Sequence, residues 1–198
     1  NVFYEIGTEQ AIKRIDPWEL DILLKKLKER LSPEKFDNIL YVVVQSGTKL
    51  FKNTNIGVYN KENLKESIDV VKKYNKLSKC HNGDYLTFEQ IHDKFSVGLD
   101  CINAAPEFGG FMSEVLLDVF NKYEMETLFN SCLNSGTWKK WVSPDYDPKQ
   151  NPDELIKICG HYVVNNDEIK SIISKYPRIY GMVKEMVYYK LSGILNIK

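Results

Sequence analysis

A histidine, an amide and a carboxylate lie within four residues of one another in the stretch Cys80 to Tyr85, which reads Cys-His-Asn-Gly-Asp-Tyr. His81 is a candidate metal ligand or acid/base group, because a neutral imidazole binds zinc and titrates near neutral pH. Asn82 and Asp84 are candidate substrate-binding residues, and a neighbouring carboxylate can also fix the tautomer of a histidine. One histidine does not complete a catalytic zinc site, which takes about three protein ligands. The alternative is a polar loop without a chemical role.

Three further polar clusters each follow an apolar run: Gly7-Thr8-Glu9-Gln10, Gln45-Ser46-Gly47-Thr48 and Asn103-Ala104-Ala105-Pro106-Glu107. Glu9 and Glu107 are candidate catalytic bases, although a carboxylate in the first turn of a helix is also stabilised by the helix dipole. Gln45 and Ser46 are candidate substrate-binding residues in a loop that could hold a phosphate, or could simply be a turn. Asn103 could bind a substrate hydroxyl or phosphate.

The elements that position these clusters alternate between strand and helix. Strand-like runs cover residues 2–6, 39–44, 77–80 and 99–102, and helices are predicted to begin at Asp16, Asn60 and Thr87 and to cover 111–123. This order predicts an α/β fold with a parallel sheet and right-handed crossovers. Because the carboxyl ends of parallel strands meet at one edge, we expect the four polar clusters to converge there.

The strand pattern stops near Glu124. Residues 138–152, which contain Trp138-Lys139-Lys140-Trp141 and several prolines, predict a break, and three helices are predicted over 151–158, 167–176 and 178–195. We therefore predict an α/β domain over residues 1–135 and an all-α appendage over 136–198. The tyrosines of the last helix are expected to be packing residues rather than a platform for stacked bases; they are Tyr180, Tyr188 and Tyr189.

Composition excludes several classes of function. The chain has 27 basic and 27 acidic residues and no net charge, which argues against a nucleic-acid partner. No apolar run approaches the roughly 20 residues of a membrane span. Four dispersed cysteines without a Cys-x-x-Cys pair are typical of a reduced, cytoplasmic protein. The chain opens at Asn1 directly in a strand-like run, so we expect it to be part of a longer protein.

The strand-end motifs resemble the family of the non-catalytic subunit of class II D-tagatose-1,6-bisphosphate aldolase. The resemblance covers nearly the whole chain and is carried by residues 4–9, 41–47, 80–85, 102–109 and 138–141. It implies a TIM-type (β/α)₈ barrel, of which this chain would supply the last four βα units followed by C-terminal helices. The first four strands would precede Asn1. Because a half barrel leaves two strand edges uncovered, we expect an oligomer or a requirement for the missing half.

The resemblance also implies a chemistry. The related class II ketose-bisphosphate aldolases hold zinc with three strand-end histidines, and the zinc stabilises the enediolate formed by carbon–carbon cleavage. By position His81 matches one zinc ligand, Gln45 stands where a second histidine is expected, and the third would come from the missing half. Glu9 and Asn103 resemble polar residues of the active-site mouth. The implied function is an aldolase-like subunit that supports a catalytic aldolase acting on a tagatose or ketose bisphosphate.

Two alternatives stay open. The chain could be a self-sufficient, metal-dependent sugar-phosphate lyase or isomerase that uses His81, Glu9, Glu107 and Asn103. It could also be a non-enzymatic assembly protein whose helical tail forms a homo-oligomer and whose pocket is vestigial. The sequence leaves open whether the chain is catalytically competent, which sugar phosphate it binds, whether zinc is held, and which partner it has.

Overall fold

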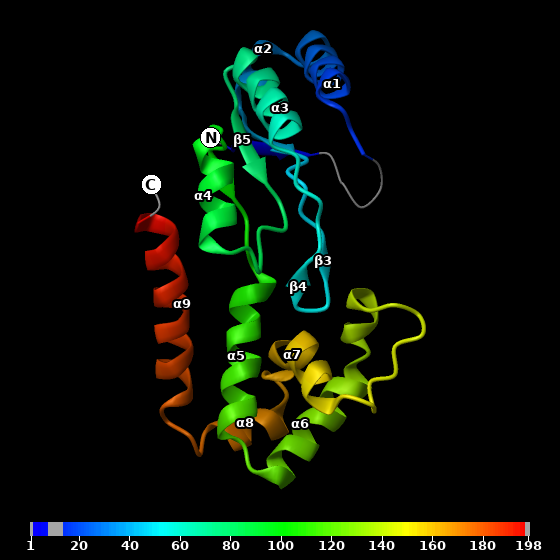
Figure 1. Cartoon of the computed structure of the whole chain (residues 1–198), viewed down its shortest axis with the longest axis vertical. Coiled ribbons are helices and arrows are strands. Elements are labelled where there is room, and N and C mark those ends of the chain that lie inside the picture. The colour runs from blue at the N-terminus through cyan, green and yellow to red at the C-terminus, as the bar shows by residue number, and fades with distance from the viewer. Residues whose placement is uncertain (1, 8–13, 197–198) are drawn as a thin grey trace. The chain divides into compact units, whose positions relative to one another are not determined.

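The computed structural model describes residues 2–7 and 14–196, and the chain divides into two compact units (Figure 1). The first unit comprises the described residues of 1–49 and 55–104, and the second comprises 50–54 and 105–196. The units divide between Ala104 and Ala105. The predicted domain boundary at residue 135 is a different position and stays a prediction.

The first unit is built on a four-stranded sheet of β1 (Tyr4–Ile6), β2 (Ile39–Val44), β5 (Leu77–Cys80) and β6 (Cys101–Ile102). The strand order is β1-β2-β5-β6, and every neighbouring pair is parallel. All four carboxyl ends therefore lie along one edge of the sheet. This confirms the predicted α/β fold with a parallel sheet, whereas the half barrel and its appendage stay predictions.

Four helices accompany the sheet: α1 (Pro17–Arg30), α2 (Pro33–Asp37), α3 (Lys61–Lys73) and α4 (Phe88–Ser96). The predicted helix starts are confirmed by their caps. The Glu19 carboxylate accepts a hydrogen bond from the Asp16 N–H, and the Asn60 side chain accepts one from the Asn63 N–H. At α4, Thr87 and Gln90 form a reciprocal capping box. The short helix α2 was not predicted.

One face of the sheet forms the core of the first unit. Val42, Val44 and Cys80 are buried there with Leu24 of α1 and Ile68 of α3. Because side chains alternate along a strand, the neighbouring positions point to the opposite face. The register aligns Glu5 with Tyr41, Val43 with Lys79, and Lys79 with Cys101 on that opposite face. Charged side chains therefore lie on the face of the sheet away from this core.

The second unit is helical apart from a short hairpin. Its helices are α5 (Pro106–Val119), α6 (Lys122–Ser135), the 3₁₀ helix η1 (Thr137–Trp141), α7 (Pro152–Val163), α8 (Asp167–Ile173) and α9 (Ile179–Asn196). The hairpin strands are β3 (Leu50–Phe51) and β4 (Thr54–Asn55), of which Asn55 belongs to the first unit. The core is formed by buried residues of α5 to α9: Leu116, Leu128, Leu155, Ile156, Ile169 and Ile179.

Two expectations for the second unit differ from the structure. α5 begins at Pro106 rather than at residue 111, and α6 was not predicted. The prediction that the tyrosines of α9 are packing residues is wrong for the described chain, because Tyr180, Tyr188 and Tyr189 are 64%, 73% and 72% exposed. The side of α9 that packs in this unit instead carries Met182 and Met186.

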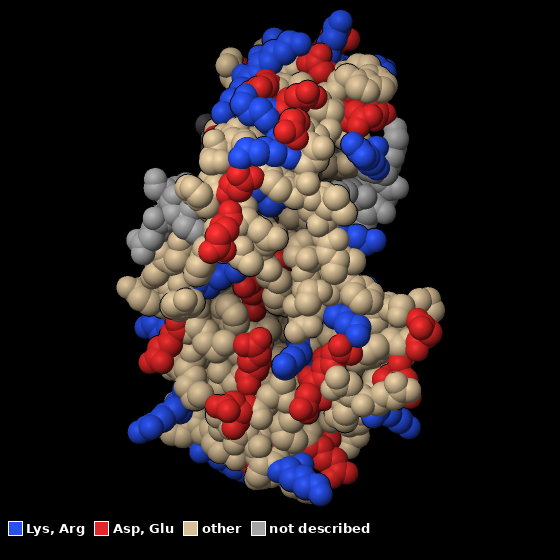
Figure 2. All heavy atoms as spheres, in the orientation of Figure 1, with Lys and Arg blue, Asp and Glu red and all other residues tan. Residues whose placement is uncertain are grey.

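The surface carries charge of both signs. On the face shown in Figure 2, Lys and Arg side chains are interspersed with Asp and Glu side chains. This pattern agrees with the absence of net charge in the sequence. None of the helices in the described part of the chain is both long and apolar enough to cross a membrane.

Candidate functional site

A charged network lies at the strand ends, on the face of the sheet opposite the core of the first unit. Glu5 of β1 contacts two residues of the β5 end: its Oε1 lies 2.6 Å from His81 Nε2, and its Oε2 accepts a hydrogen bond of 2.5 Å from Lys79 Nζ. The Lys79 ammonium also lies 5.2 Å from the centroid of the Tyr41 ring. The side chains of Glu5, Lys79 and His81 all keep partial solvent access. Neither Glu5 nor Lys79 was predicted as a site residue, and the catalytic and metal-binding roles of His81 stay predictions.

This network fixes the charge state of Glu5. Partial burial opposes ionisation, but the hydrogen bonds from Lys79 and His81 lower the pKa of the Glu5 carboxyl. The hydrogen bond to Glu5 raises the pKa of Lys79 in turn. Because an ionised carboxylate only accepts hydrogen bonds, His81 Nε2 must carry the proton in this contact. The sequence signal for this network was the presence of charged residues in strands of a parallel sheet, because such strands are otherwise apolar.

The loop after β2 is held by buried hydrogen bonds. Gln45 Oε1 accepts a hydrogen bond of 2.8 Å from the Ile15 N–H, and the Ser46 hydroxyl donates one of 2.7 Å to Cys80 Sγ. The Thr48 hydroxyl donates to the carbonyl of His81 at 2.6 Å, which ties this loop to the end of β5. Gln45 and Ser46 are both buried. These contacts hold the loop in place, and the substrate-binding roles of Gln45 and Ser46 stay predictions.

Lys94 of α4 also binds the loop after β2. Its side chain is 2% exposed, its Nζ donates a hydrogen bond of 2.5 Å to the Ser46 carbonyl, and it lies 4.0 Å from the centroid of the Tyr59 ring. Burial lowers the pKa of Lys94. A carbonyl and an aromatic face both favour a buried cation at this position. Lys94 therefore positions the loop, and nothing in the sequence distinguishes it from a surface lysine.

Asn55 joins the loops that follow β2 and β5. Its Nδ2 donates hydrogen bonds of 2.9 Å to the carbonyls of Asn82 and Asp84. Its Oδ1 accepts hydrogen bonds from the N–H groups of Lys49 and Gly57, at 3.1 and 3.3 Å. All four hydrogen bonds reach backbone atoms of the first unit, so Asn55 sets the spacing between the two loops. Sequence reasoning missed this residue.

The loop after β5 also binds the end of β6. Gly83 N–H donates to the Asn103 carbonyl at 2.9 Å, and Asn103 N–H donates to the Cys80 carbonyl at 2.8 Å. A Cβ at Gly83 would lie 2.1 Å from Ile102 Cγ2, so only glycine fits there. His81, Asn82, Asp84 and Asn103 are thus brought to the same strand-end edge. Asp84 is 2% exposed, whereas Asn103 is exposed.

The two remaining catalytic candidates lie elsewhere. Glu107 belongs to the second unit, where Lys190 of α9 holds its carboxylate at 2.7 Å in a nearly buried ion pair. His81 and Glu107 therefore lie in different units. Glu9 lies outside the described residues. The catalytic roles of both glutamates stay predictions.

A pocket of about 520 Å³ opens at the end of β2, within the first unit. Two basic residues, Lys49 and Arg14, line it together with Gln45, Gly47, Ile56, Gly57, Val58, Tyr59, Asn60 and Asn63. Its walls approach closely at two glycines: a Cβ at Gly57 would lie 2.1 Å from the Gly47 carbonyl oxygen, and Gly47 has a φ of 70°. The pocket thus combines positively charged side chains with side-chain amides.

Zinc is not accommodated by the described residues of this chain alone. Among them, no group of three or more His, Cys, Asp or Glu side chains is arranged to hold a metal ion. His81 Nε2 contacts Glu5, and Gln45 Oε1 binds the Ile15 amide. The partial zinc site that the resemblance implies would therefore need ligands from elsewhere.

The overall fold is shared with known enzymes. No protein-family model matches the sequence, and a comparison with curated proteins gives no match. A probable tagatose 6 phosphate kinase from Sinorhizobium meliloti 1021 matches with a TM-score of 0.66 and 13% identity over 91% of this chain and 50% of that chain. The fructuronate-tagaturonate epimerase UxaE from Cohnella laeviribosi matches with a TM-score of 0.71 and 11% identity over 99% and 45%. These similarities show the fold alone. The chain spans about half the length of both structures.

Proposed function

We propose that this chain functions in sugar metabolism and binds an anionic sugar, carrying a phosphate or a carboxylate, in the pocket at the end of β2. The observation that carries the proposal is the placement of Lys49 and Arg14 in a pocket of about 520 Å³ at the carboxyl edge of a parallel sheet. Pockets that bind small molecules have volumes of about 300–1,000 Å³, and α/β sheets bind ligands at this edge.

The chemistry of the lining supports an anionic sugar. The Lys49 and Arg14 side chains supply positive charge for a phosphate or carboxylate, while Asn60 and Asn63 supply polar side chains for the sugar hydroxyls. The structures with the same fold are named for sugars with one acidic group, a tagatose phosphate and two uronates. Both observations favour the same ligand class.

The charged network adds a proton-transfer group at the same strand-end edge of the sheet. Glu5 holds the proton on Nε2 of His81, and Lys79 supplies a cation next to them. A histidine held in this way can exchange a proton with a sugar hydroxyl or with the carbon next to a carbonyl. His81 and Glu5 are the residues that we propose for this role, and Asn103, which is exposed at the same edge, is proposed to contact the sugar.

Lys49 gives the first test. Replacing Lys49 by glutamine is expected to weaken binding of tagatose 6-phosphate or tagaturonate by about tenfold or more, because a charge-assisted hydrogen bond contributes roughly 1.5–3 kcal/mol. Calorimetric titration of the purified chain measures this, with neutral tagatose as the reference ligand. Lys26→Gln on α1 removes the same charge from an exposed position outside the pocket and is the matched control. Unchanged affinity in Lys49→Gln, or equally tight binding of neutral tagatose, would rule out the anionic subsite.

The finer role that we propose is a subunit that supports a separate catalytic aldolase. The hydrogen bond between Gln45 and Ile15 favours it, because Gln45 is then a structural residue at a position where the resemblance expects a zinc ligand. The alternative is a self-sufficient sugar-phosphate lyase or isomerase.

Retro-aldol cleavage of tagatose 1,6-bisphosphate separates these roles. The chain alone is expected to show little turnover, and a class II aldolase subunit with zinc is expected to gain activity or lifetime when the chain is added. Cleavage by the chain alone that disappears in His81→Ala would support the self-sufficient enzyme instead. A catalytic subunit that is unaffected by the chain contradicts the supporting role.

A further inference from the structure

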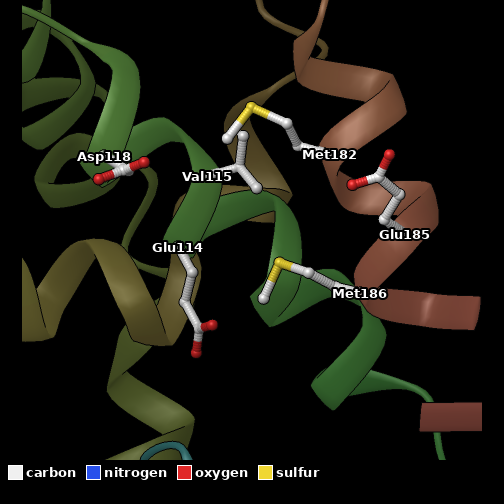
Figure 3. Close-up of a pocket in the computed structure, with 6 residues that line it drawn as sticks. All are labelled: Glu114, Val115, Asp118, Met182, Glu185 and Met186. Carbon is white, nitrogen blue, oxygen red and sulfur yellow. The ribbon is translucent and has the colours of Figure 1, made fainter. Parts of the chain in front are cut away.

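A groove in the second unit combines an apolar floor with an acidic rim. It has a volume of about 350 Å³ and is lined by Glu114, Val115 and Asp118 of α5 and by Met182, Glu185 and Met186 of α9. Figure 3 shows both methionine side chains extending from α9 toward α5, where Val115 lies. The three carboxylates lie around this floor and point in different directions. The groove lies within the second unit and has no part in the proposed sugar site.

The rim carboxylates differ from three other carboxylates of this unit, which are held by lysines. Glu107 pairs with Lys190, Glu154 pairs with Lys52, and Glu124 binds both Lys175 and Tyr176. None of Glu114, Asp118 and Glu185 forms an ion pair with another described residue. Three like charges around a partly exposed apolar floor favour a ligand that is apolar in the middle and positive at its edges.

We propose that this groove is a docking site for an amphipathic helix of another polypeptide chain, with Lys or Arg flanking its apolar stripe. Glu114 and Asp118 are one turn apart on α5, so basic residues spaced four apart on a partner helix can reach both. Methionine side chains adapt to differently shaped apolar partners, which suits a groove that receives a helix. A metal ion fits less well, because the carboxylates diverge and no described group of three is arranged to hold one.

The binding of a model peptide tests the charge complementarity. The probe is a fluorescent helical peptide of roughly 18 residues with leucine on one face and lysine on the other, and a peptide with glutamate in place of lysine is the reference. We expect the lysine peptide to bind the complete chain, binding to weaken at high ionic strength, and the glutamate peptide not to bind. Fluorescence anisotropy measures all three.

Charge-reversal variants test whether the lysine peptide binds in the groove. The double variant Glu114→Lys, Glu185→Lys is expected to weaken binding of the lysine peptide by about tenfold or more. Met186→Gln is also expected to weaken this binding, because it places a polar group in the apolar floor of the groove. The double variant Glu126→Lys, Glu168→Lys changes the charge equally at exposed positions of α6 and α8 and is the control. Circular dichroism establishes that each variant is folded.

Several results would overturn the proposal. They are no binding of the lysine peptide, equal binding of the glutamate peptide, or the same loss in the control as in the groove variant. Sedimentation is measured in parallel. If the wild-type chain self-associates and the Glu114→Lys, Glu185→Lys variant does not, the groove is occupied by a second copy of this chain rather than by a different partner.

Discussion

Replacing Lys190 by methionine is expected to lower the free energy of unfolding by about 3–5 kcal/mol. Lys190 Nζ lies 2.7 Å from Glu107 Oε1, and the two side chains are only 11% and 8% exposed. Methionine keeps most of the aliphatic volume of lysine but removes the cation. The carboxylate of Glu107 would then stay buried without the charge that offsets its desolvation, which is why the expected loss is much larger than that of a surface ion pair.

Urea unfolding followed by circular dichroism measures this effect. Lys184→Met on the same helix is the matched control, because Lys184 is exposed and such substitutions usually change stability by less than about 0.5 kcal/mol. The double variant Lys190→Met, Glu107→Leu should recover much of the loss, since it removes both buried charges. Equal stabilities of Lys190→Met and Lys184→Met would show that the ion pair does not stabilise the fold.

This ion pair also bears on the role predicted for Glu107. If Glu107 serves only to bind Lys190, Glu107→Gln lowers stability and leaves sugar binding in the first unit unchanged. If Glu107 is a catalytic base, the same variant loses turnover even when it is fully folded. The two readouts are independent, so one variant distinguishes the structural role from the catalytic one.

Local signals in the sequence predicted many of the elements correctly. The caps at Asp16 and Thr87 predicted the starts of α1 and α4, and the β-branched run at 39–44 predicted β2. The missed helix α6 also had signals, because Asn121 and Glu124 form a capping box and Gly136 ends the helix in the left-handed conformation. These signals act within a few residues of one another, so sequence reasoning can use them.

The candidate site was less predictable because its geometry comes from contacts between distant residues. His81 and the strand-end edge follow from the order of strands, but Glu5 contacts His81 across 76 positions of the chain. Two of the four partners of Asn55 lie 27 and 29 positions away, and that of Lys94 lies 48 positions away. Lys94 and Asn55 look like surface residues in the sequence until these contacts are known, and the charge of Glu5 in a strand-like run does not reveal its partner.

A second large effect is expected from pH in the second unit. His161 of α7 packs its ring 4.0 Å from that of Tyr162 and against Gly109, where an added Cβ would lie 2.6 Å from His161 Cδ2. Its Nδ1 is buried and has no hydrogen-bond partner among the described residues. Burial, together with the nearby charge of Lys140, lowers the pKa of His161 from 6.5 to about 4. The ring is therefore neutral in the folded chain at neutral pH.

This lowered pKa couples protonation to unfolding. Between about pH 6.5 and 4 the unfolded chain binds a proton at this position that the folded chain does not, so stability falls as the pH decreases through this range and is not lost further below it. At about 1.4 kcal/mol per pKa unit, the full shift corresponds to roughly 3.5 kcal/mol. Because the ring keeps some solvent contact, we expect a loss of about 1–3 kcal/mol.

Unfolding free energies at pH 7 and pH 4 measure the loss in the wild type and in His161→Gln. The carboxylates titrate in both proteins, so the difference between the two losses of unfolding free energy is the contribution of His161. His92→Gln is the control, because it makes the same substitution at an exposed position of α4. If His161→Gln loses as much stability as the wild type over this range, the imidazole is protonated in the folded state and the buried Nδ1 must have an acceptor. The pH dependence therefore tests whether the α5–α7 contact requires a neutral histidine.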